Sequence, residues 1–257
     1  MTLILGLDCA DGLLLASDGQ ATIGTSGQHL KGPCEKIFCA WNNVAWGGSG
    51  QVGIIQRVEQ ALCARFASPD DLDNKQTHVV RELLASAVAE VVRPLLTGRY
   101  IQGPGSDPFT SYLFVGHVPQ GSFILEIGPD LVDEDHIARG YSAIGSGDIF
   151  PYFALTGLAH FNVRQTRLAG AKLIAYRVVD NAISAAATGL GYPIQMIEIK
   201  KPTKSGEPAT AHKLDEGELR ILGDKVTEWK TLEAEILRQY VGLPTESPEQ
   251  PDQPLPA

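Results

Sequence analysis

Apolar residues alternate with short turn-forming breaks along the first fifty positions of the chain. Residues 2–9 and 12–18 form two apolar runs separated by two residues, a pattern that predicts a β-hairpin. The second run is apolar on both faces, which indicates a strand covered on both sides. The same strand, tight turn, strand pattern returns at residues 36–40 and 43–47. We therefore expect two hairpins in this part of the chain.

Helical spacing of apolar residues replaces this alternation farther along. The pattern predicts helices from Val52 to Leu62 and from about Asp71 to Leu96. Later elements are expected as strands at 111–118, 122–127 and 142–144, helices at 149–160 and 163–187, and a strand at 194–200. Runs of strands separated by helix pairs favour antiparallel sheets covered by helices. The predicted class is α+β, a four-layer αββα sandwich of two antiparallel sheets flanked by helices.

The domain organisation follows from the same patterns. Residues 1–201 are expected to form one domain, and residues 202–243 a C-terminal extension. Apolar residues at helical spacing predict an amphipathic helix from Asp215 to Tyr240 within this extension. Its apolar face packs either on its own domain or between subunits. The tail at 244–257 is rich in Pro, Glu and Gln, which predicts disorder.

Composition and charge exclude several classes of protein. The chain is 44% hydrophobic and 20% charged, as expected of a globular protein, and its formal net charge is -9. This acidity argues against nucleic-acid binding, which needs clustered Lys and Arg. No apolar run approaches the roughly 20 residues that span a bilayer, and no signal peptide is evident, so we expect a cytoplasmic protein. The cysteines and histidines lack metal-binding spacing, and no metal site is expected.

Thr2 is the first candidate for chemistry. Removal of Met1 would leave a free α-amine beside the Thr2 hydroxyl. Such a residue carries a nucleophile and a general base together, because the neutral amine can accept the hydroxyl proton directly or through water. Many proteins begin with Met-Thr, so the residues that follow must decide whether this one is catalytic.

Four segments behind Thr2 form an ordered set of motifs. They are Thr2-Leu3-Ile4-Leu5-Gly6, the run from Asp11 to Thr22 with Asp18 at its strand end, Lys36-Ile37-Phe38, and Ala45-Trp46-Gly47-Gly48-Ser49-Gly50. In this order they resemble the opening of proteasome β subunits and their bacterial relatives, over residues 2 to 60. The resemblance implies the N-terminal-nucleophile hydrolase fold.

The resemblance also implies roles for individual residues. Asp18 and Lys36 would form a buried pair beside the nucleophile, with Lys36 bonded to the Thr2 oxygen. Its ammonium would favour the alkoxide and lower the pKa of the α-amine from its usual value near 8. Gly47 would donate its backbone N–H to the oxyanion of the tetrahedral intermediate. Ser146, in the Gly-Ser-Gly at 145–147, would hold the amine and relay its proton.

One family feature is missing from the second half of the chain. Ala187 stands where the family has an aspartate that supports the serine, and Asp180, about two helical turns earlier, is the candidate replacement. The ending Gly191-Tyr192-Pro193-Ile194 and the absence of a propeptide are similar to the Anbu and β-proteobacterial proteasome-homologue branches. The resemblance assigns substrate binding to Ala21, Thr22, Ala45 and Ser49, and the small Ala21 and Ala45 indicate a roomy apolar pocket.

The function implied is a threonine-type peptidase that cleaves peptides or unfolded proteins. It would act within a homo-oligomer, either a ring or an open helical stack, with an unfoldase as a further partner that the sequence itself does not indicate. No cofactor is expected, because the amine, Lys36 and Ser146 can handle the proton transfers. Two alternatives stay open: an amidase acting on a non-peptide substrate, and an inactive scaffold subunit. The joint presence of Thr2, Asp18 and Lys36 speaks against the scaffold.

Overall fold

The computed structural model contains two antiparallel sheets and a set of covering helices, so the predicted α+β class is confirmed. The structure describes residues 1–23, 30–41, 43–66, 72, 75–98, 110–185, 189–204 and 207–242. Within them, no helix is long and apolar enough to cross a membrane.

The first sheet holds the start of the chain at its centre. Its five strands lie in the order β10 (Tyr141–Ile144), β1 (Ile4–Cys9), β2 (Gly12–Ser17), β11 (Gln195–Lys200) and β12 (Thr210–Lys213), and every pair is antiparallel. β1 and β2 pair from Ile4 opposite Ser17 to Cys9 opposite Gly12, which confirms the first predicted hairpin. The residues just before Ile4 therefore leave the sheet at the same end as the last residue of β2, Ser17.

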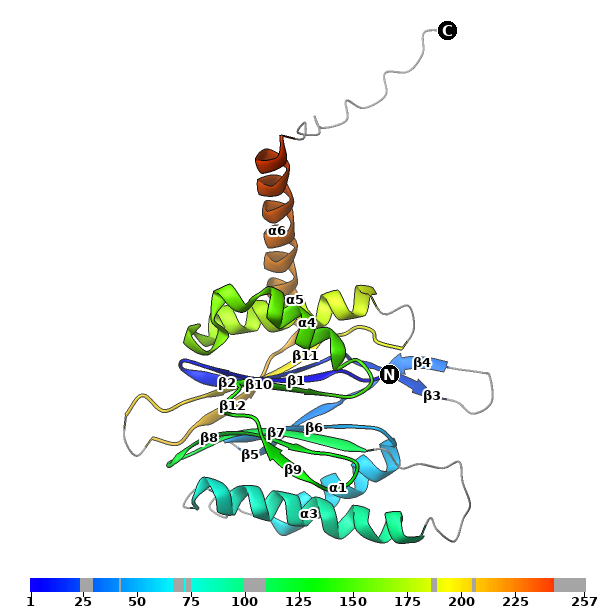
Figure 1. Cartoon of the computed structure of the whole chain (residues 1–257). Coiled ribbons are helices and arrows are strands. Elements are labelled where there is room, and N and C mark those ends of the chain that lie inside the picture. The colour runs from blue at the N-terminus through cyan, green and yellow to red at the C-terminus, as the bar shows by residue number, and fades with distance from the viewer. Residues whose placement is uncertain are drawn as a thin grey trace.

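The second sheet contains the other predicted hairpin. Its five strands are β5 (Ile37–Trp41), β6 (Val44–Ser49), β7 (Ser111–Val118), β8 (Gly121–Ile127) and β9 (Asp133–Asp135), again all antiparallel. A small two-stranded sheet joins β3 (Gln20–Ile23) and β4 (Leu30–Pro33). It follows β2 directly and lies beside the N-terminus (Figure 1).

Helices cover the outer faces of the sheets, except for α6, which packs against α5. They are α1 (Val52–Arg65), α3 (Thr77–Gly98), α4 (Ile149–Gly157), α5 (Leu168–Ala185) and α6 (Glu216–Val241), with short 3-10 turns η2 (Ala159–Phe161) and η3 (Val163–Gln165). Figure 1 shows the two sheets one above the other, with α4 and α5 beyond the first and α1 and α3 beyond the second.

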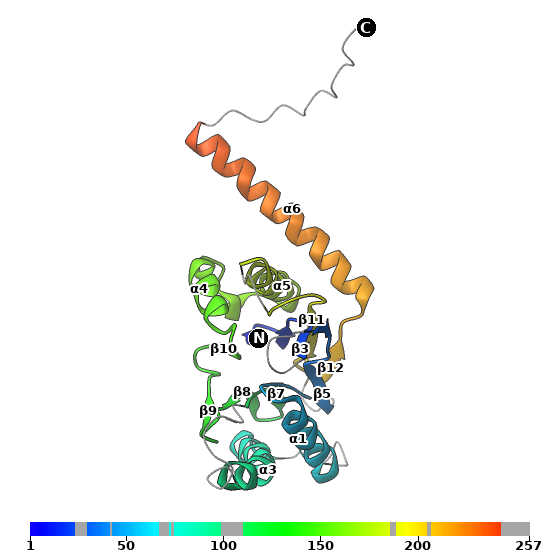
Figure 2. The same cartoon turned by 90° about the vertical axis from the view of Figure 1, so that its right-hand side faces the viewer.

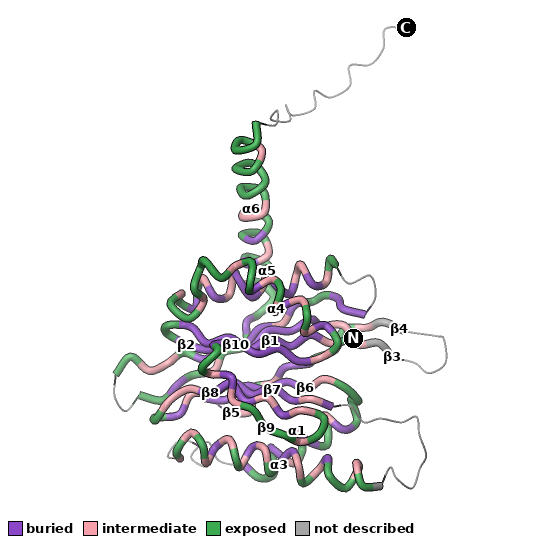
Figure 3. The backbone as a smooth tube through the Cα atoms, viewed as in Figure 1, coloured by how far each residue is buried: buried purple, intermediate pink, exposed green. Residues whose placement is uncertain are grey.

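Apolar side chains fill the spaces between these elements. In β2, Leu13 and Leu15 belong to the cluster between the sheets, whereas Leu14 and Ala16 belong to the cluster under α5. Successive strand residues point to opposite faces, so a strand covered on both sides must be apolar throughout. All six residues of β2 are buried, as the sequence predicted, and Figure 3 shows burial concentrated in the two sheets.

Two local differences from the expected elements stand out, and one expected position falls outside the described residues. The helix predicted at 163–187 begins only at Leu168, because the left-handed Asn162 (φ 45°) and the bond from the Thr166 hydroxyl to the Phe161 carbonyl hold a separate turn before it. β12 was not predicted; it lies in the polar stretch that was assigned to the extension, yet it pairs with β11. Ala187 lies outside the described residues.

Helix α6 matches the amphipathic helix predicted near the C-terminus. Asp215 caps it, accepting a bond from the Glu218 backbone while the Glu218 side chain bonds back to Asp215. Leu222 and Val226 are its buried residues, and beyond them the helix extends away from the sheets (Figure 2). The predicted disordered tail lies outside the described part of the chain.

Candidate active site

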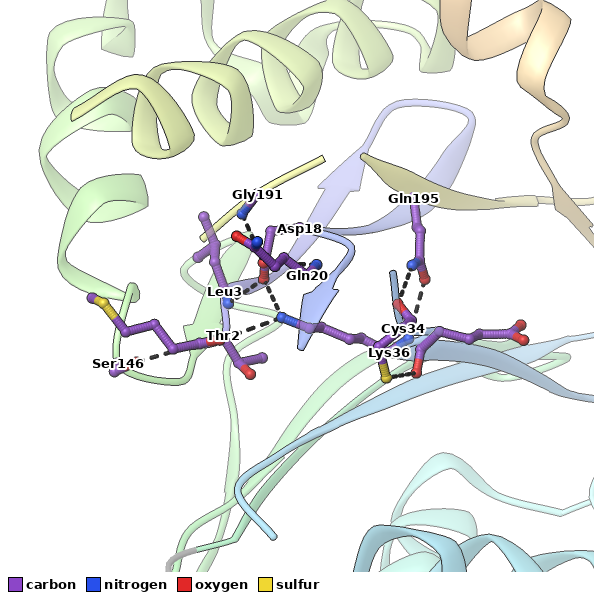
Figure 4. A network of polar contacts seen from close by, with 11 residues as sticks. Thr2, Leu3, Asp18, Gln20, Cys34, Lys36, Ser146, Gly191 and Gln195 are labelled. Carbon is purple, nitrogen blue, oxygen red and sulfur yellow. Dashed lines mark hydrogen bonds and ion pairs between the residues drawn. The ribbon is translucent and has the colours of Figure 1, made fainter. Parts of the chain in front are cut away.

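Thr2 lies just before β1, where the turn at residues 145–147 passes next to it. The backbone nitrogen of Thr2 donates to Ser146 Oγ over 3.3 Å, and the Thr2 carbonyl accepts from the backbone N–H of Gly147 over 3.1 Å. Figure 4 shows Ser146 on one side of Thr2 and Lys36 on the other. The structure thus brings together Thr2, Ser146 and Lys36, which are far apart in the sequence.

The turn can approach Thr2 this closely because residue 145 is glycine. Gly145 has a φ of +98°, a left-handed conformation that L side chains rarely adopt. A Cβ added there would lie 2.2 Å from the Thr2 carbonyl oxygen. The Gly-Ser-Gly turn is therefore fitted to hold the backbone of Thr2 as well as to present Ser146.

Asp18 and Lys36 form a buried ion pair beside Thr2. Lys36 Nζ lies 2.7 Å from Asp18 Oδ1, with side-chain exposures of 6% and 0%. Asp18 Oδ1 also accepts the backbone N–H of Leu3 over 2.9 Å. Buried charges need a compensating partner, so this carboxylate both neutralises Lys36 and fixes the residue next to the candidate nucleophile.

Burial has a clear effect on the Lys36 ammonium. Loss of hydration lowers the pKa of Lys36 from its ordinary value, and attraction to the Asp18 carboxylate opposes that shift. Besides Asp18, Lys36 Nζ donates to the Met1 carbonyl oxygen over 3.4 Å. The expected bond to the Thr2 hydroxyl is not among the hydrogen bonds of the described residues. The ammonium instead reaches the peptide bond that is cut when Met1 is removed.

The backbone around Lys36 is held by a side chain from the opposite end of the sequence. Gln195, at the start of β11, accepts from the Lys36 backbone N–H over 3.1 Å and donates to the Cys34 carbonyl over 2.6 Å. One amide side chain thus clamps the segment that carries the lysine. Sequence reasoning missed Gln195, because nothing local marks a partner 159 positions away.

A cavity of about 360 Å³ opens beside Thr2. Met1, Thr2 and Lys36 line it near the candidate nucleophile, and Ala21 and Gly48 line it too. This volume lies within the usual range of small-molecule sites. The placement of Ala21 agrees with its expected role in substrate binding.

The other three residues expected to bind substrate do not line this cavity with Ala21 in the described part of the structure. Ala45 is fully buried between the two sheets and is not part of the cavity wall, so it cannot shape the pocket directly. Ser49 is half-buried, with its hydroxyl 3.0 Å from the Cβ position of Gly145. The side chain of Thr22 lies outside the described part of the structure.

Gly47, the expected oxyanion donor, is not among the residues that line the cavity, whereas Gly48 is. Gly47 faces the space between the sheets, where an added Cβ would lie 2.9 Å from Ile4 Cδ1. Gly48 faces the opposite way, toward Ile55, and lines the cavity. Pairing of β6 with β5 ends at Gly47, so the strand edge beyond it is free of the β5 ladder. Gly48 and Gly50 are the glycines that line the cavity together with Thr2.

Asp180 does not take the place that the sequence suggested. One of its carboxylate oxygens accepts from the Tyr192 hydroxyl, and the other lies 2.5 Å from Lys230 Nζ on α6. The carboxylate therefore links α5 to α6 and to the loop before β11, instead of supporting Ser146. An alignment shift by two helical turns cannot supply the missing family carboxylate.

This geometry has a simple chemical consequence for Thr2. While Met1 is attached, the Thr2 nitrogen is a peptide amide and has no basic lone pair. Hydrolysis of that peptide bond would convert the same nitrogen, 3.3 Å from Ser146 Oγ, into an amine. The buried ammonium of Lys36 would then lie beside both reactive groups of Thr2.

Solved structures of other proteins match the fold of this chain. No protein-family model and no curated protein matches the chain. Among solved structures, Anbu (ancestral β-subunit) from Yersinia bercovieri has a TM-score of 0.71 at 17% identity, with 95% of this chain and 99% of that chain covered. The helical assembly of the Anbu complex from Pseudomonas aeruginosa has a TM-score of 0.69 at 17% identity, with 96% and 98% covered. Along nearly its whole length, the chain thus has the fold of Anbu, the ancestral β-subunit.

Proposed function

We propose that this protein is a threonine-type peptidase whose nucleophile is the Thr2 hydroxyl and whose base is the α-amine of the same residue, once Met1 has been removed. The observation that carries the proposal is the position of Thr2 between Ser146 Oγ and the buried Lys36–Asp18 pair, at the edge of a cavity. We also infer that the two stacked sheets and their helices form the αββα sandwich of the N-terminal-nucleophile hydrolases.

The first half of the reaction makes an ester. The amine accepts the Thr2 hydroxyl proton as the oxygen attacks the substrate carbonyl, and Lys36 stabilises the developing alkoxide. The backbone N–H of Gly48 donates to the oxyanion of the tetrahedral intermediate, a role that suits a cavity-lining glycine. Collapse of the intermediate breaks the amide bond. The ammonium of Thr2 gives its proton to the departing amine, and Ser146 holds the Thr2 nitrogen in place.

The second half releases the product. A water molecule gives a proton to the Thr2 amine and attacks the ester carbonyl, and the Thr2 oxygen then leaves and regains the proton. Every proton transferred in these steps comes from the Thr2 hydroxyl, the Thr2 amine or water. The substrates proposed are peptides or unfolded proteins, and the working state is a homo-oligomer.

A comparison of three forms of the protein tests this mechanism. Wild type, Thr2→Ser and Thr2→Ala are purified, and intact mass identifies the fraction of each that lacks Met1. Hydrolysis of a panel of fluorogenic peptides is then measured. We expect activity in wild type and Thr2→Ser, which keep a hydroxyl and an amine, and a loss of at least about 10³-fold in Thr2→Ala.

Two results would contradict the proposal. One is equal hydrolysis by wild type and Thr2→Ala, because the hydroxyl would then be unnecessary. The other is a fully processed wild type that cleaves none of the peptides. Assays of that processed protein with non-peptide amides would then separate an amidase from an inactive scaffold subunit.

A further inference from the structure

One face of α1 forms a wall of the cavity beside Thr2. Val52, Ile55, Gln56 and Glu59 all line the cavity, and their spacing of three, four and seven residues places them on one side of the helix. The rise from the first to the last is about 10 Å. The cavity therefore has length along α1, and it changes from apolar to acidic along this wall.

The charged side chains that line the cavity differ in whether they have an ion-pair partner. Lys36 is neutralised by Asp18, and Glu35 by an ion pair with Lys213. Glu59 is half-buried in the cavity wall, and it has no ion-pair partner among the residues that the structure describes. Glu59 thus places on the cavity wall a carboxylate that forms no ion pair with any described side chain.

The remaining wall suits the stem of a long side chain. Phe38 from β5 and Val52 and Ile55 from α1 supply apolar surface to the cavity that Thr2 and Glu59 also line. Lys and Arg bury a methylene stem against apolar surface while the charged end reaches a polar group. Leu or Phe would use the apolar wall but leave the Glu59 carboxylate partly desolvated and unpaired, which is unfavourable.

We propose that this cavity selects substrates with Lys or Arg at the residue whose carbonyl Thr2 attacks, and that Glu59 binds the cationic end of that side chain. The inference rests on the proposed peptidase function and names its substrate class. The small side chain of Ala21 leaves room in the cavity, and the apolar residues of α1 and β5 contact the stem. Glu59 is a specificity-determining residue that lies away from the reacting atoms.

Matched peptides test this selection directly. The peptides differ only at the residue whose carbonyl Thr2 attacks, which is Lys, norleucine, Leu or Glu. The kcat/KM of each peptide is measured for processed wild type, Glu59→Gln and Glu59→Lys. Norleucine has nearly the same stem as Lys without the charge. In wild type we expect Lys to exceed norleucine by about tenfold, the usual scale of one charge-assisted hydrogen bond. Glu59→Gln removes the preference, and Glu59→Lys makes Glu better than Lys.

The control is Glu235→Gln, which makes the same change in net charge on an exposed part of α6. It should keep the wild-type preference for Lys. A wild type that prefers norleucine or Leu, or a preference for Lys that survives in Glu59→Gln, would overturn the inference.

A binding measurement separates this inference from the peptidase proposal. Fluorescence anisotropy measures how tightly the Lys and norleucine peptides bind to the Thr2→Ala protein, which should not cleave them. The same measurement is made on the double variant Thr2→Ala, Glu59→Gln. Tighter binding of the Lys peptide that depends on Glu59 supports the cavity's selectivity even if no peptide is hydrolysed. Equal binding of the two peptides contradicts it, whatever the activity.

Discussion

At the scale of single residues, Asp18 organises the candidate active site. Its two oxygens accept from Lys36 Nζ and from the backbone N–H groups of Leu3, Gln20 and Gly191, at 2.7 to 3.3 Å. These donors come from four separate parts of the chain, and Figure 4 shows them around the carboxylate. An uncharged side chain could not satisfy a buried ammonium in the same way.

Replacement of Asp18 by Asn should therefore change both stability and pH dependence. Removal of one partner from a buried ion pair costs about 3–5 kcal/mol of unfolding free energy. Attraction to Asp18 raises the pKa of Lys36 against the larger lowering by burial, so its loss lowers that pKa further. If catalysis needs the ammonium, the alkaline limb of kcat/KM moves to lower pH in Asp18→Asn.

Urea unfolding and a pH profile of kcat/KM measure these two effects. Asp8→Asn is a suitable control, because Asp8 pairs with Lys201 over 2.8 Å at the far end of β1. It should lower stability without moving the alkaline limb. An unchanged or higher limb in Asp18→Asn would show that Lys36 does not act as the required cation.

At the scale of elements, the site depends on how strand ends and turns meet. β1 lies between β10 and β2, so Thr2 emerges between the end of β10 and the end of β2. The end of β10 leads into the turn that holds Ser146, and the end of β2 leads into Asp18. This pairing order alone places the serine and the carboxylate on either side of Thr2.

Gly145→Ala tests whether the turn after β10 sets the geometry of Thr2. The added methyl meets the Thr2 carbonyl and requires a left-handed φ, which together cost about 1–3 kcal/mol. We expect lower stability and at least a tenfold loss of kcat, because displacement of the nucleophile by about 1 Å costs more than tenfold.

Gly157→Ala, at the end of α4, is the matched control. Nothing lies within 4 Å of its Cβ position, so the change should be neutral or slightly stabilising. Thermal unfolding and peptide hydrolysis are compared for both variants. If Gly145→Ala keeps the wild-type kcat, the turn connects β10 to α4 without setting the geometry of Thr2.

At the scale of the whole molecule, α6 lies beyond α5 and extends away from the two sheets (Figure 2). The distal part of α6 exposes Ile236, Leu237 and Tyr240, at 64%, 61% and 90% of their surfaces. Contiguous exposed apolar surface is unusual for a monomeric protein. This feature is consistent with the proposed homo-oligomer.

The assembly state can be measured directly. We expect light scattering of the purified full chain to report a mass several times that of the 27.6 kDa monomer. Electron microscopy of the same sample would distinguish a closed ring from an open helical stack. A strict monomer across the working concentrations would contradict the oligomer, although it would leave the chemistry of Thr2 to the hydrolysis assays.

The sequence by itself determined the local elements and the residues around the nucleophile. Alternation of apolar residues predicted β1 and β2, helical spacing predicted α1 and α6, and the family resemblance of the ordered motifs implied that Thr2, Asp18 and Lys36 are neighbours. These features depend on contacts close in sequence or on motifs with a defined order, so a linear pattern can carry them.

Only the tertiary structure decided which residues share the site with Thr2. Alternation along β6 placed the Cβ side of Gly47 toward the space between the sheets and that of Gly48 toward Ile55 and the cavity. Asp180 was drawn to Tyr192 and Lys230, and Gln195 reached the Lys36 backbone from another strand. Such contacts join distant segments, and they exist only once the sheets and helices have packed.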